Sequence, residues 1–537
     1  MLLAEVVATS AAVGATRARL AKRDALAALL RAAPPEEVAA ATAWLAGEPR
    51  QGRLGAGWRT LSTLELAPAA EPTLTLMRVD ALLDALAATS GTGSAARRAA
   101  LLGELFGAAT EAEQRFLVRL LTGELRQGAL EGVMLDAVAA AAEVPPATVR
   151  RAFMLSGRLP ETASLALRGG APALEGVTLR VGRPVRPMLA SPGSSLDAAL
   201  ATLGPDVSVE YKLDGARIQV HRKGEDVQVW TRTLREITAS VPELVEHVRA
   251  LPCRTVVLDG ESLALDDDGR PRPFQETMSR FGSDPLAAND SERRAAATSG
   301  PPAANDSERR AAATSDTAPT LLSPFFFDLL HRDGTDLIDE PLHVRLAALD
   351  ALLAAHPALR MPGARRPTAE AAAEVLDAAL AAGHEGVVVK ALDAPYAAGR
   401  RGKAWQKVKP VHTLDLVVIG AEWGYGRRTG SLSNIHLGAR DPAGGEPVMV
   451  GKTFKGMTDE LLAWQTATFP ALAREEHGHQ VLLRPELVVE IALDGVQRST
   501  RYPGGVALRF ARVVRYRPDR TPADADTIDT VRALLPG

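Results

Sequence analysis

The lysine at position 212 lies in a stretch that could do chemistry. In VSVEYKLDGARIQVHRKG (207–224), apolar residues alternate with polar ones as in a half-buried strand. Glu210 and Lys212 therefore share one face, and Asp214-Gly215 interrupts the run. Taken alone, the stretch favours a hairpin that turns at Asp-Gly and exposes its charged side.

Four further segments carry acidic, aromatic or basic residues beside predicted strands. They are DGE (259–261), FDLL (327–330), EGVVVK (385–390) and WQKVK (405–409). Each one alone fits an ordinary structural role as a strand end, a core aromatic or a solvated basic face. The neighbouring elements must bring them to one place if they form a site.

The first 175 residues predict a helical domain. Thr110-Glu-Ala-Glu113 is a capping-box pattern ahead of apolar residues at helical spacing, and it predicts a helix that ends near Gly128. VMLDAVAAAA predicts a second helix that stops at Pro145-Pro146, and TVRRAFML predicts a third.

From about residue 180 the pattern changes to short β-branched runs separated by Gly, Pro and Asp. Helical stretches such as 344–356 intervene, so this part predicts an α+β or mixed-sheet domain. After Pro410, another strand-rich block with Gly-rich turns fits a small β-barrel of the OB type.

A tandem repeat stands apart from these elements. AANDSERRAAATS occurs at 287–299 and again at 303–315, without an apolar stripe that could form a stacked core. We interpret residues 285–318 as an inserted surface loop.

The composition limits the class of protein. A chain of 537 residues suggests roughly two to four domains. The single cysteine, Cys253, excludes an intrachain disulfide and a Cys-rich zinc module. We find neither a long apolar run nor a secretory signal pattern, which favours a cytoplasmic protein without a membrane span. The net charge of −3 does not by itself indicate a nucleic-acid partner.

The motif series KLDGAR (212–217), DGE, FDLL, EGVVVK and WQKVK resembles that of the covalent nucleotidyltransferases, in particular the archaeal and bacterial group of ATP-dependent DNA ligases. The likeness extends to PVRPMLA (184–190), TRTLREIT (231–238), RFARVVRYRPDR (509–520) and the helical RFLVRLLTGELRQGALEG (115–132). It implies a multidomain fold: an all-α DNA-binding domain (1–178), an α+β adenylyltransferase domain of the ATP-grasp-like nucleotidyltransferase type (179–410) and an OB-fold β-barrel (411–537).

The resemblance implies that the chain seals nicks in duplex DNA in replication, repair or recombination. Lys212 attacks the α-phosphate of ATP to give lysyl-AMP, AMP passes to the 5′-phosphate of the nick, and the 3′-hydroxyl displaces AMP. A lysine must lose its proton before it attacks, and we expect Arg217 and a bound metal to lower the pKa of Lys212. A monomer that encircles the DNA is implied; sliding-clamp or repair partners are not identified.

The resemblance also assigns roles residue by residue. Glu261 and Glu385 hold Mg²⁺, Phe327 stacks on adenine, and Glu210 recognises the edge of the base. Arg517 and Arg520 reach the leaving pyrophosphate once their domain closes. The remaining nucleotide contacts go to the ribose and phosphates and come from basic residues: Arg217, Arg232, Lys390, Arg401 and Lys407.

The chain departs from the family pattern at two positions, and neither change removes a catalytic group. Arg520 stands where the family usually has lysine, and Ala511 where it usually has proline. Two alternative enzymes share the lysine motif, a capping guanylyltransferase and an RNA ligase. Neither has need of a long helical domain, so the helical region of this chain disfavours both. An NAD⁺-dependent ligase normally brings a four-cysteine zinc module, and this chain has one cysteine. A catalytically dead DNA-binding scaffold is the alternative from another class.

Overall fold

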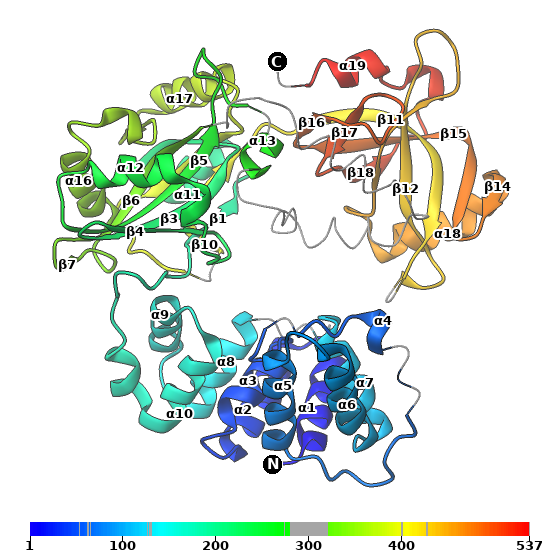
Figure 1. Cartoon of the computed structure of the whole chain (residues 1–537). Helices are drawn as coiled ribbons and strands as arrows, with labels where there is room; N and C mark the ends of the chain where they lie inside the picture. Colours follow the sequence, from blue (N-terminus) through cyan, green and yellow to red (C-terminus); the bar gives the residue numbers. More distant parts are fainter. Residues whose placement is uncertain are drawn as a thin grey trace.

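The computed structural model describes the chain except for residues 53, 62–63, 65, 126, 128–130, 273, 280–320, 399–400, 426–427 and 536–537. The tandem repeat and the whole of the predicted 285–318 loop lie outside the described residues. Figure 1 shows three bodies: a helical one that contains the N-terminus and two sheet-containing ones.

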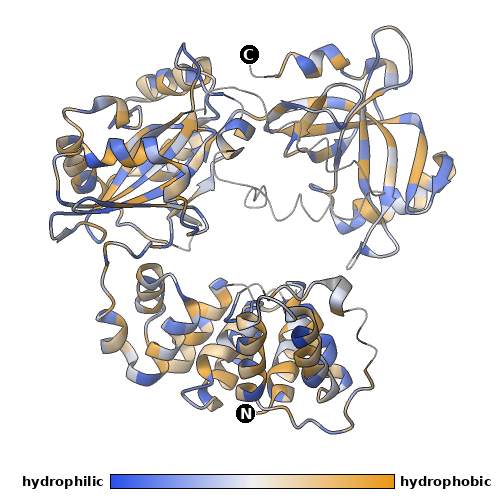
Figure 2. Cartoon of the chain, viewed as in Figure 1, coloured by the Kyte–Doolittle hydropathy of each residue, from blue (hydrophilic) through white to orange (hydrophobic). Residues whose placement is uncertain are grey.

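The N-terminal body consists of helices, as predicted. They are α1 (Leu3–Ala15), α2 (Arg19–Ala32), α3 (Val38–Leu45), α4 (Trp58–Leu61), α5 (Leu76–Ala88), α6 (Ser94–Gly107), α7 (Glu111–Leu121), α8 (Glu131–Ala142), α9 (Pro146–Ser156) and α10 (Leu159–Glu175). Their apolar faces share one core that includes the fully buried Trp44. Figure 2 shows these faces as orange stretches along the helices.

The helix at 111–121 confirms the capping box but not its predicted end. Glu113 accepts hydrogen bonds from the backbone and hydroxyl of Thr110, 2.8 Å each. The helix ends at Leu121 rather than near Gly128. Gly123 follows in the left-handed region at φ +70°, a conformation that terminates helices and that glycine adopts at little cost.

The central body has two five-stranded sheets. The first has the order β1 (Leu189–Pro192), β10 (Arg401–Val408), β9 (Gly386–Ala391), β2 (Val207–Lys212), β8 (Gly363–Arg365). The second has the order β4 (Asp226–Thr231), β3 (Ala216–Lys223), β5 (Thr255–Ala264), β6 (Leu322–Arg332), β7 (Thr335–Asp336). The mixed α+β character of the prediction is confirmed.

The predicted hairpin at Asp214-Gly215 is wrong. Lys212 at the end of β2 pairs with Gly386 in the first sheet, whereas Arg217 in β3 pairs with Glu261 in the second. The chain therefore crosses between sheets at this point. A Cβ on Gly215 would lie 2.6 Å from the carbonyl oxygen of Ser262, so the crossing requires glycine.

Helices pack against both sheets. α17 (Ala369–Ala381) contacts β2 and β9, and α16 (Leu342–Leu352) contacts β6. The remaining helices of this body are α11 (Leu196–Leu203), α12 (Pro242–Arg249) and α13 (Phe274–Ser279). The packing leaves two apolar cores under the sheets and a third between them and α9.

The C-terminal body is a sheet domain. Its main sheet has the order β13 (Val448–Thr453), β12 (Leu432–Ala439), β11 (His412–Trp423), β15 (Gln480–Leu493), β14 (Ala473–His477), with β18 (Arg512–Tyr516) also on β15. β16 (Gly495–Arg498) pairs with β17 (Val506–Arg509), and helices α18 (Asp459–Leu472) and α19 (Ile528–Arg532) complete the body. Among the described strands the pairing follows an open path rather than the closed barrel that the sequence predicted.

No helix in the described part of the chain combines the length and apolar character needed to cross a membrane.

A buried ion pair fixes β6 to α16. The side chains of Arg345 and Asp328 are both 0% exposed, and they bond at 2.7 and 3.0 Å. Arg345 also donates to the backbone oxygens of Glu340 and Ala394. Asp328 follows Phe327 directly, so this ion pair holds in place the strand that carries Phe327, the residue predicted to stack on adenine.

We expect Arg345→Ala to destabilise the chain by about 3 to 5 kcal/mol, because it leaves the Asp328 carboxylate buried without its partner. Arg365→Ala is the matched control, since its pair with Asp350 is partly exposed and contributes about 0 to 1 kcal/mol. Urea denaturation of both variants measures the difference. Equal losses in the two variants would contradict the assignment.

Candidate active site

Lys212 points from the end of β2 to Glu385, which lies directly before β9. The ammonium donates to one carboxylate oxygen of Glu385, and Lys409 lies 2.9 Å from the other. The backbone N–H of Glu385 donates to the carbonyl of Lys212 at 3.0 Å, so the two residues are held together by backbone and side chain alike. Lys212 is therefore part of an ion-paired cluster, not the solvated face of a hairpin.

The charges around Lys212 favour its protonated form. Burial alone lowers the pKa of Lys212, but the carboxylates of Glu385, Glu261 and Asp214 outweigh burial and raise it above its ordinary value. The expected lowering of this pKa by Arg217 together with a bound metal stays a prediction. In the ligand-free arrangement the carboxylates outweigh burial, and Arg217 is paired with Asp259.

The two predicted metal ligands differ in their titration. Burial raises the pKa of Glu261 to about 7, although Lys212 and Arg217 oppose the shift. Burial alone would raise the pKa of Glu385 as well. The attraction between this carboxylate and the ammonium groups of Lys212 and Lys409 outweighs burial and lowers the pKa to about 2. The site thus holds one firmly ionised carboxylate and one that titrates near neutral pH.

Arg217 forms a fork with the buried Asp259. Its Nε and Nη2 donate to the two carboxylate oxygens at 2.7 and 2.5 Å, and its Nη1 donates to the carbonyl of Met188 at 3.0 Å. The guanidinium lies 4.9 Å from the centroid of the Phe327 ring. Asp259, the first residue of DGE, had no role in the sequence prediction, and the structure places it as the partner of Arg217.

A second buried pair lies behind Phe327. Lys390 bonds to Glu210 at 2.5 Å, with side chains 3% and 2% exposed. The ammonium of Lys390 lies 4.2 Å from the ring centroid of Phe327 and 4.4 Å from that of Trp405. Three predicted nucleotide residues, Glu210, Phe327 and Lys390, are therefore brought together, and Arg360 joins them at 3.4 Å from Glu210.

The other predicted nucleotide residues are less closely defined. Arg232 is exposed directly after β4, and Lys407 lies two residues after Trp405 on the same face of β10. Arg401 begins β10, but its side chain is outside the described residues. Arg360 and Tyr396 were missed, since neither lies in a motif and only the fold brings them close.

The C-terminal body contacts the site through ion pairs. Arg509 forks onto Asp214, two residues after Lys212, at 2.6 and 3.2 Å. Lys409 bridges Glu385 and Asp494, which lies 3.4 Å away between β15 and β16. This body therefore contacts the KLDGAR segment that contains Lys212.

The two arginines predicted to reach pyrophosphate are engaged elsewhere. Arg517 pairs with Asp415 at 3.0 Å and with Asp519 at 2.7 Å. Arg520 lies 3.2 Å from Asp415. Both pairs lie within the C-terminal body, so a role at Lys212 requires a different orientation of that body.

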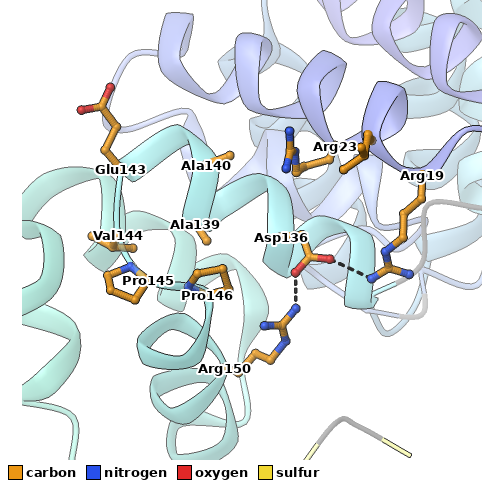
Figure 3. Close-up of a pocket in the computed structure, with 11 residues that line it drawn as sticks. Arg19, Arg23, Asp136, Ala139, Ala140, Glu143, Val144, Pro145, Pro146 and Arg150 are labelled. Atoms are coloured by element: carbon orange, nitrogen blue, oxygen red, sulfur yellow. Dashed lines mark hydrogen bonds and ion pairs between the residues drawn. The ribbon is translucent and has the colours of Figure 1, made fainter.

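Figure 3 shows a surface pocket of the helical body that contains none of the predicted site residues. Asp136 lies between two arginines there, bonding Arg19 at 2.8 Å and also Arg150. These bonds tie α2, α8 and α9 together. The polar residues of this pocket therefore have a structural role, the joining of three helices through Asp136.

Three family models match successive parts of the chain. The ATP dependent DNA ligase domain matches residues 187–409, the DNA ligase N terminus matches 59–139, and the ATP dependent DNA ligase C terminal region matches 428–520. The first match contains every residue predicted to bind nucleotide or metal.

Curated relatives match over the full length. The chain is 63% identical to a probable DNA ligase of Nocardia farcinica over 537 residues, 100% of both chains. It is 56% identical to a probable DNA ligase of Mycobacterium marinum over 99% of this chain and 100% of that one. The solved structure Pmar-Lig_PreS3 has a TM-score of 0.59 at 18% identity, over 95% of this chain and 99% of that one, and indicates a shared fold.

We expect Glu385→Gln to lower the pKa of Lys212. In the unaltered chain, burial lowers this pKa and three carboxylates raise it. When Glu385 is replaced by a neutral residue, the lowering by burial is opposed less, so the amine loses its proton at lower pH. Competitive acetylation of Lys212 across pH, read by mass spectrometry, measures the change.

The matched control is Glu422→Gln, which neutralises the partner of Lys452 on the C-terminal sheet. It should leave the titration of Lys212 where it was. An unchanged titration in Glu385→Gln would contradict the proposed cause of the shift.

We expect Arg509→Ala to release the C-terminal body from the catalytic motif, because the fork onto Asp214 is lost. Small-angle X-ray scattering should show a larger radius of gyration. Arg515→Ala removes a pair within the C-terminal body and should leave the radius unchanged. Identical scattering from Arg509→Ala and the unaltered chain would show that this contact does not hold the bodies together.

Proposed function

The chain belongs to the ATP-dependent DNA ligase family, and on this premise we propose how its own residues seal a nick. The enzyme uses ATP to join a 3′-hydroxyl to a 5′-phosphate in duplex DNA. The observation that carries the proposal is the position of Lys212, whose amine lies between the two sheets beside two carboxylates. The scaffold alternative is not favoured, because the nucleophile and its neighbours are all present.

Lys212 is the proposed nucleophile toward the α-phosphorus of ATP. It forms a P–N bond, pyrophosphate leaves, and the lysine gives up its proton. The carboxylates that raise its pKa in the ligand-free form must first be neutralised.

The donor set fits Mg²⁺. The described residues contain no cluster of three or more His, Cys, Asp or Glu that could hold a metal by themselves. Mg²⁺ commonly takes one or two carboxylates and completes its shell with water and substrate phosphates. Glu261 and Glu385 would hold it, and the ion would neutralise charge on the transferred phosphate.

The adenosine site is proposed at Phe327. Its ring is supported from behind by Lys390, and Trp405 packs edge-on at 6.0 Å between ring centroids. The indole N–H of Trp405 is buried and has no hydrogen-bond partner among the described residues, which favours a ligand beside it. Glu210 would read the base edge.

The ribose and phosphates are proposed to meet Arg217, Arg232, Arg401 and Lys407. A guanidinium has five N–H groups, and Arg217 directs four of them to Asp259, Met188 and Tyr396, so one donor is left for the nucleotide. We assign Lys390 to support of Phe327 and Glu210 rather than to a phosphate, because its side chain is only 3% exposed.

We propose nicked duplex DNA as the substrate of a monomer that encircles it with three domains, 1–178, 179–410 and 411–537, the last of OB type. Separate apolar cores in the helical and C-terminal bodies support this division. The proposed setting is replication, repair or recombination, and the proposed location is the cytoplasm.

We expect a covalent adduct when the chain is incubated with α-labelled ATP and Mg²⁺, and none from GTP or NAD⁺. Lys212→Ala should reduce adduct formation and nick sealing by more than about 10³-fold, because no other amine replaces the nucleophile. EDTA should abolish both reactions. Adduct formation in Lys212→Ala at the original rate would refute Lys212 as the nucleophile.

A further inference from the structure

Tyr396 is buried beside the nucleotide site, on the loop between β9 and β10. Its side chain is 2% exposed in total, and its ring packs edge-on against Trp405 with centroids 6.2 Å apart. Its hydroxyl donates to Oδ2 of Asp259 at 2.6 Å and accepts the backbone N–H of Met188 at 3.0 Å. The hydroxyl also accepts a longer hydrogen bond, 3.5 Å, directly from Nη2 of Arg217.

The partners of Tyr396 are also the partners of Arg217. Asp259 Oδ2 accepts from Tyr396 and from Arg217 Nη2, while Met188 donates to the tyrosine and accepts from Arg217 Nη1. Arg217 and Tyr396 therefore grip the same carboxylate and the same backbone residue. The two oxygens of Asp259 receive three donors in all.

From this closed network we propose that Tyr396 is a positioning residue that fixes the Arg217 guanidinium for nucleotide binding. The hydroxyl holds the Asp259 carboxylate in the plane that the fork of Arg217 requires, since bidentate pairing depends on orientation. It also fixes Met188, which precedes β1. The inference rests on the proposed role of Arg217 at the ribose and phosphates.

The loop that carries Tyr396 is itself held in place. The backbone N–H groups of Ala397 and Ala398 approach the sulfurs of Met188 and Met154 at 3.4 and 3.2 Å. Arg345 lies 5.8 Å from the ring centroid of Tyr396. These contacts hold the backbone around Tyr396 in place, so its hydroxyl can orient the carboxylate of Asp259.

Tyr396→Phe removes one oxygen and keeps the ring. We expect the KM for ATP in self-adenylation to rise about tenfold, the loss of one charge-assisted hydrogen bond, with a smaller change in kcat. Tyr516→Phe is the matched control, because it deletes a partly buried tyrosine hydroxyl bond to Gln465 in the C-terminal body. It should leave the KM for ATP unchanged. Thermal unfolding of both variants checks that they fold.

A double-mutant cycle with Arg217→Lys separates positioning from a general structural effect. If Tyr396 acts through the fork of Arg217, Tyr396→Phe should add less than about twofold once the fork is gone. An effect of equal size in both backgrounds overturns the inference, as does a KM in Tyr396→Phe equal to that of the unaltered chain. Failure of the unaltered chain to form an ATP adduct would instead overturn the proposed function.

Discussion

The crossing of the chain from one sheet to the other within KLDGAR is the constraint on which the site depends. β2 ends at Lys212 opposite Gly386, and β3 begins before Arg217 opposite Glu261. Three residues therefore separate β2 from β3, and four separate the amine of Lys212 in one sheet from the guanidinium of Arg217 in the other. The absence of a side chain at Gly215 permits this close passage, and each sheet then supplies one of the two carboxylates.

The same constraint sets the electrostatics. Lys212 and Arg217 are both cations in one narrow region, yet each has its own acidic partner, Glu385 for the lysine and Asp259 for the arginine. Pairing lowers the cost of burying these charges. It also favours the protonated form of the lysine, because the carboxylates around Lys212 raise its pKa.

Much of the site could be predicted from the sequence, because its motifs are local. Lys212, Glu261, Phe327 and Glu385 each lie in a short segment whose residue types indicate chemistry, and the α+β character followed from alternating apolar runs. The hairpin failed, since alternation predicts strands but not which strands pair.

Contacts between distant segments could not be predicted from the sequence, for the same reason. Tyr396 and Asp259 are 137 residues apart, and Arg509 and Asp214 are 295 apart. No periodicity links such residues, and only the packed sheets bring them together. The raised pKa of Lys212 in the ligand-free chain was likewise not predicted, because it depends on which partner each cation finds, not on the cations that are near in sequence.

The two outer bodies are attached to the catalytic sheets by different kinds of interaction. Met154 and Leu155 of α9 share an apolar core with Phe327 and Trp405. Burying such side chains contributes roughly 1.5 to 3 kcal/mol each and is insensitive to salt. The C-terminal body is instead held near the site by pairs such as Arg509–Asp214, whose side chains are 22% and 24% exposed. Such pairs are weaker than apolar packing and are screened by salt. Val411, between the last strand of the central body and the first of the C-terminal body, is 52% exposed. The helical body is therefore held to the central sheets by apolar packing, whereas the C-terminal body is held to them by partly exposed ion pairs.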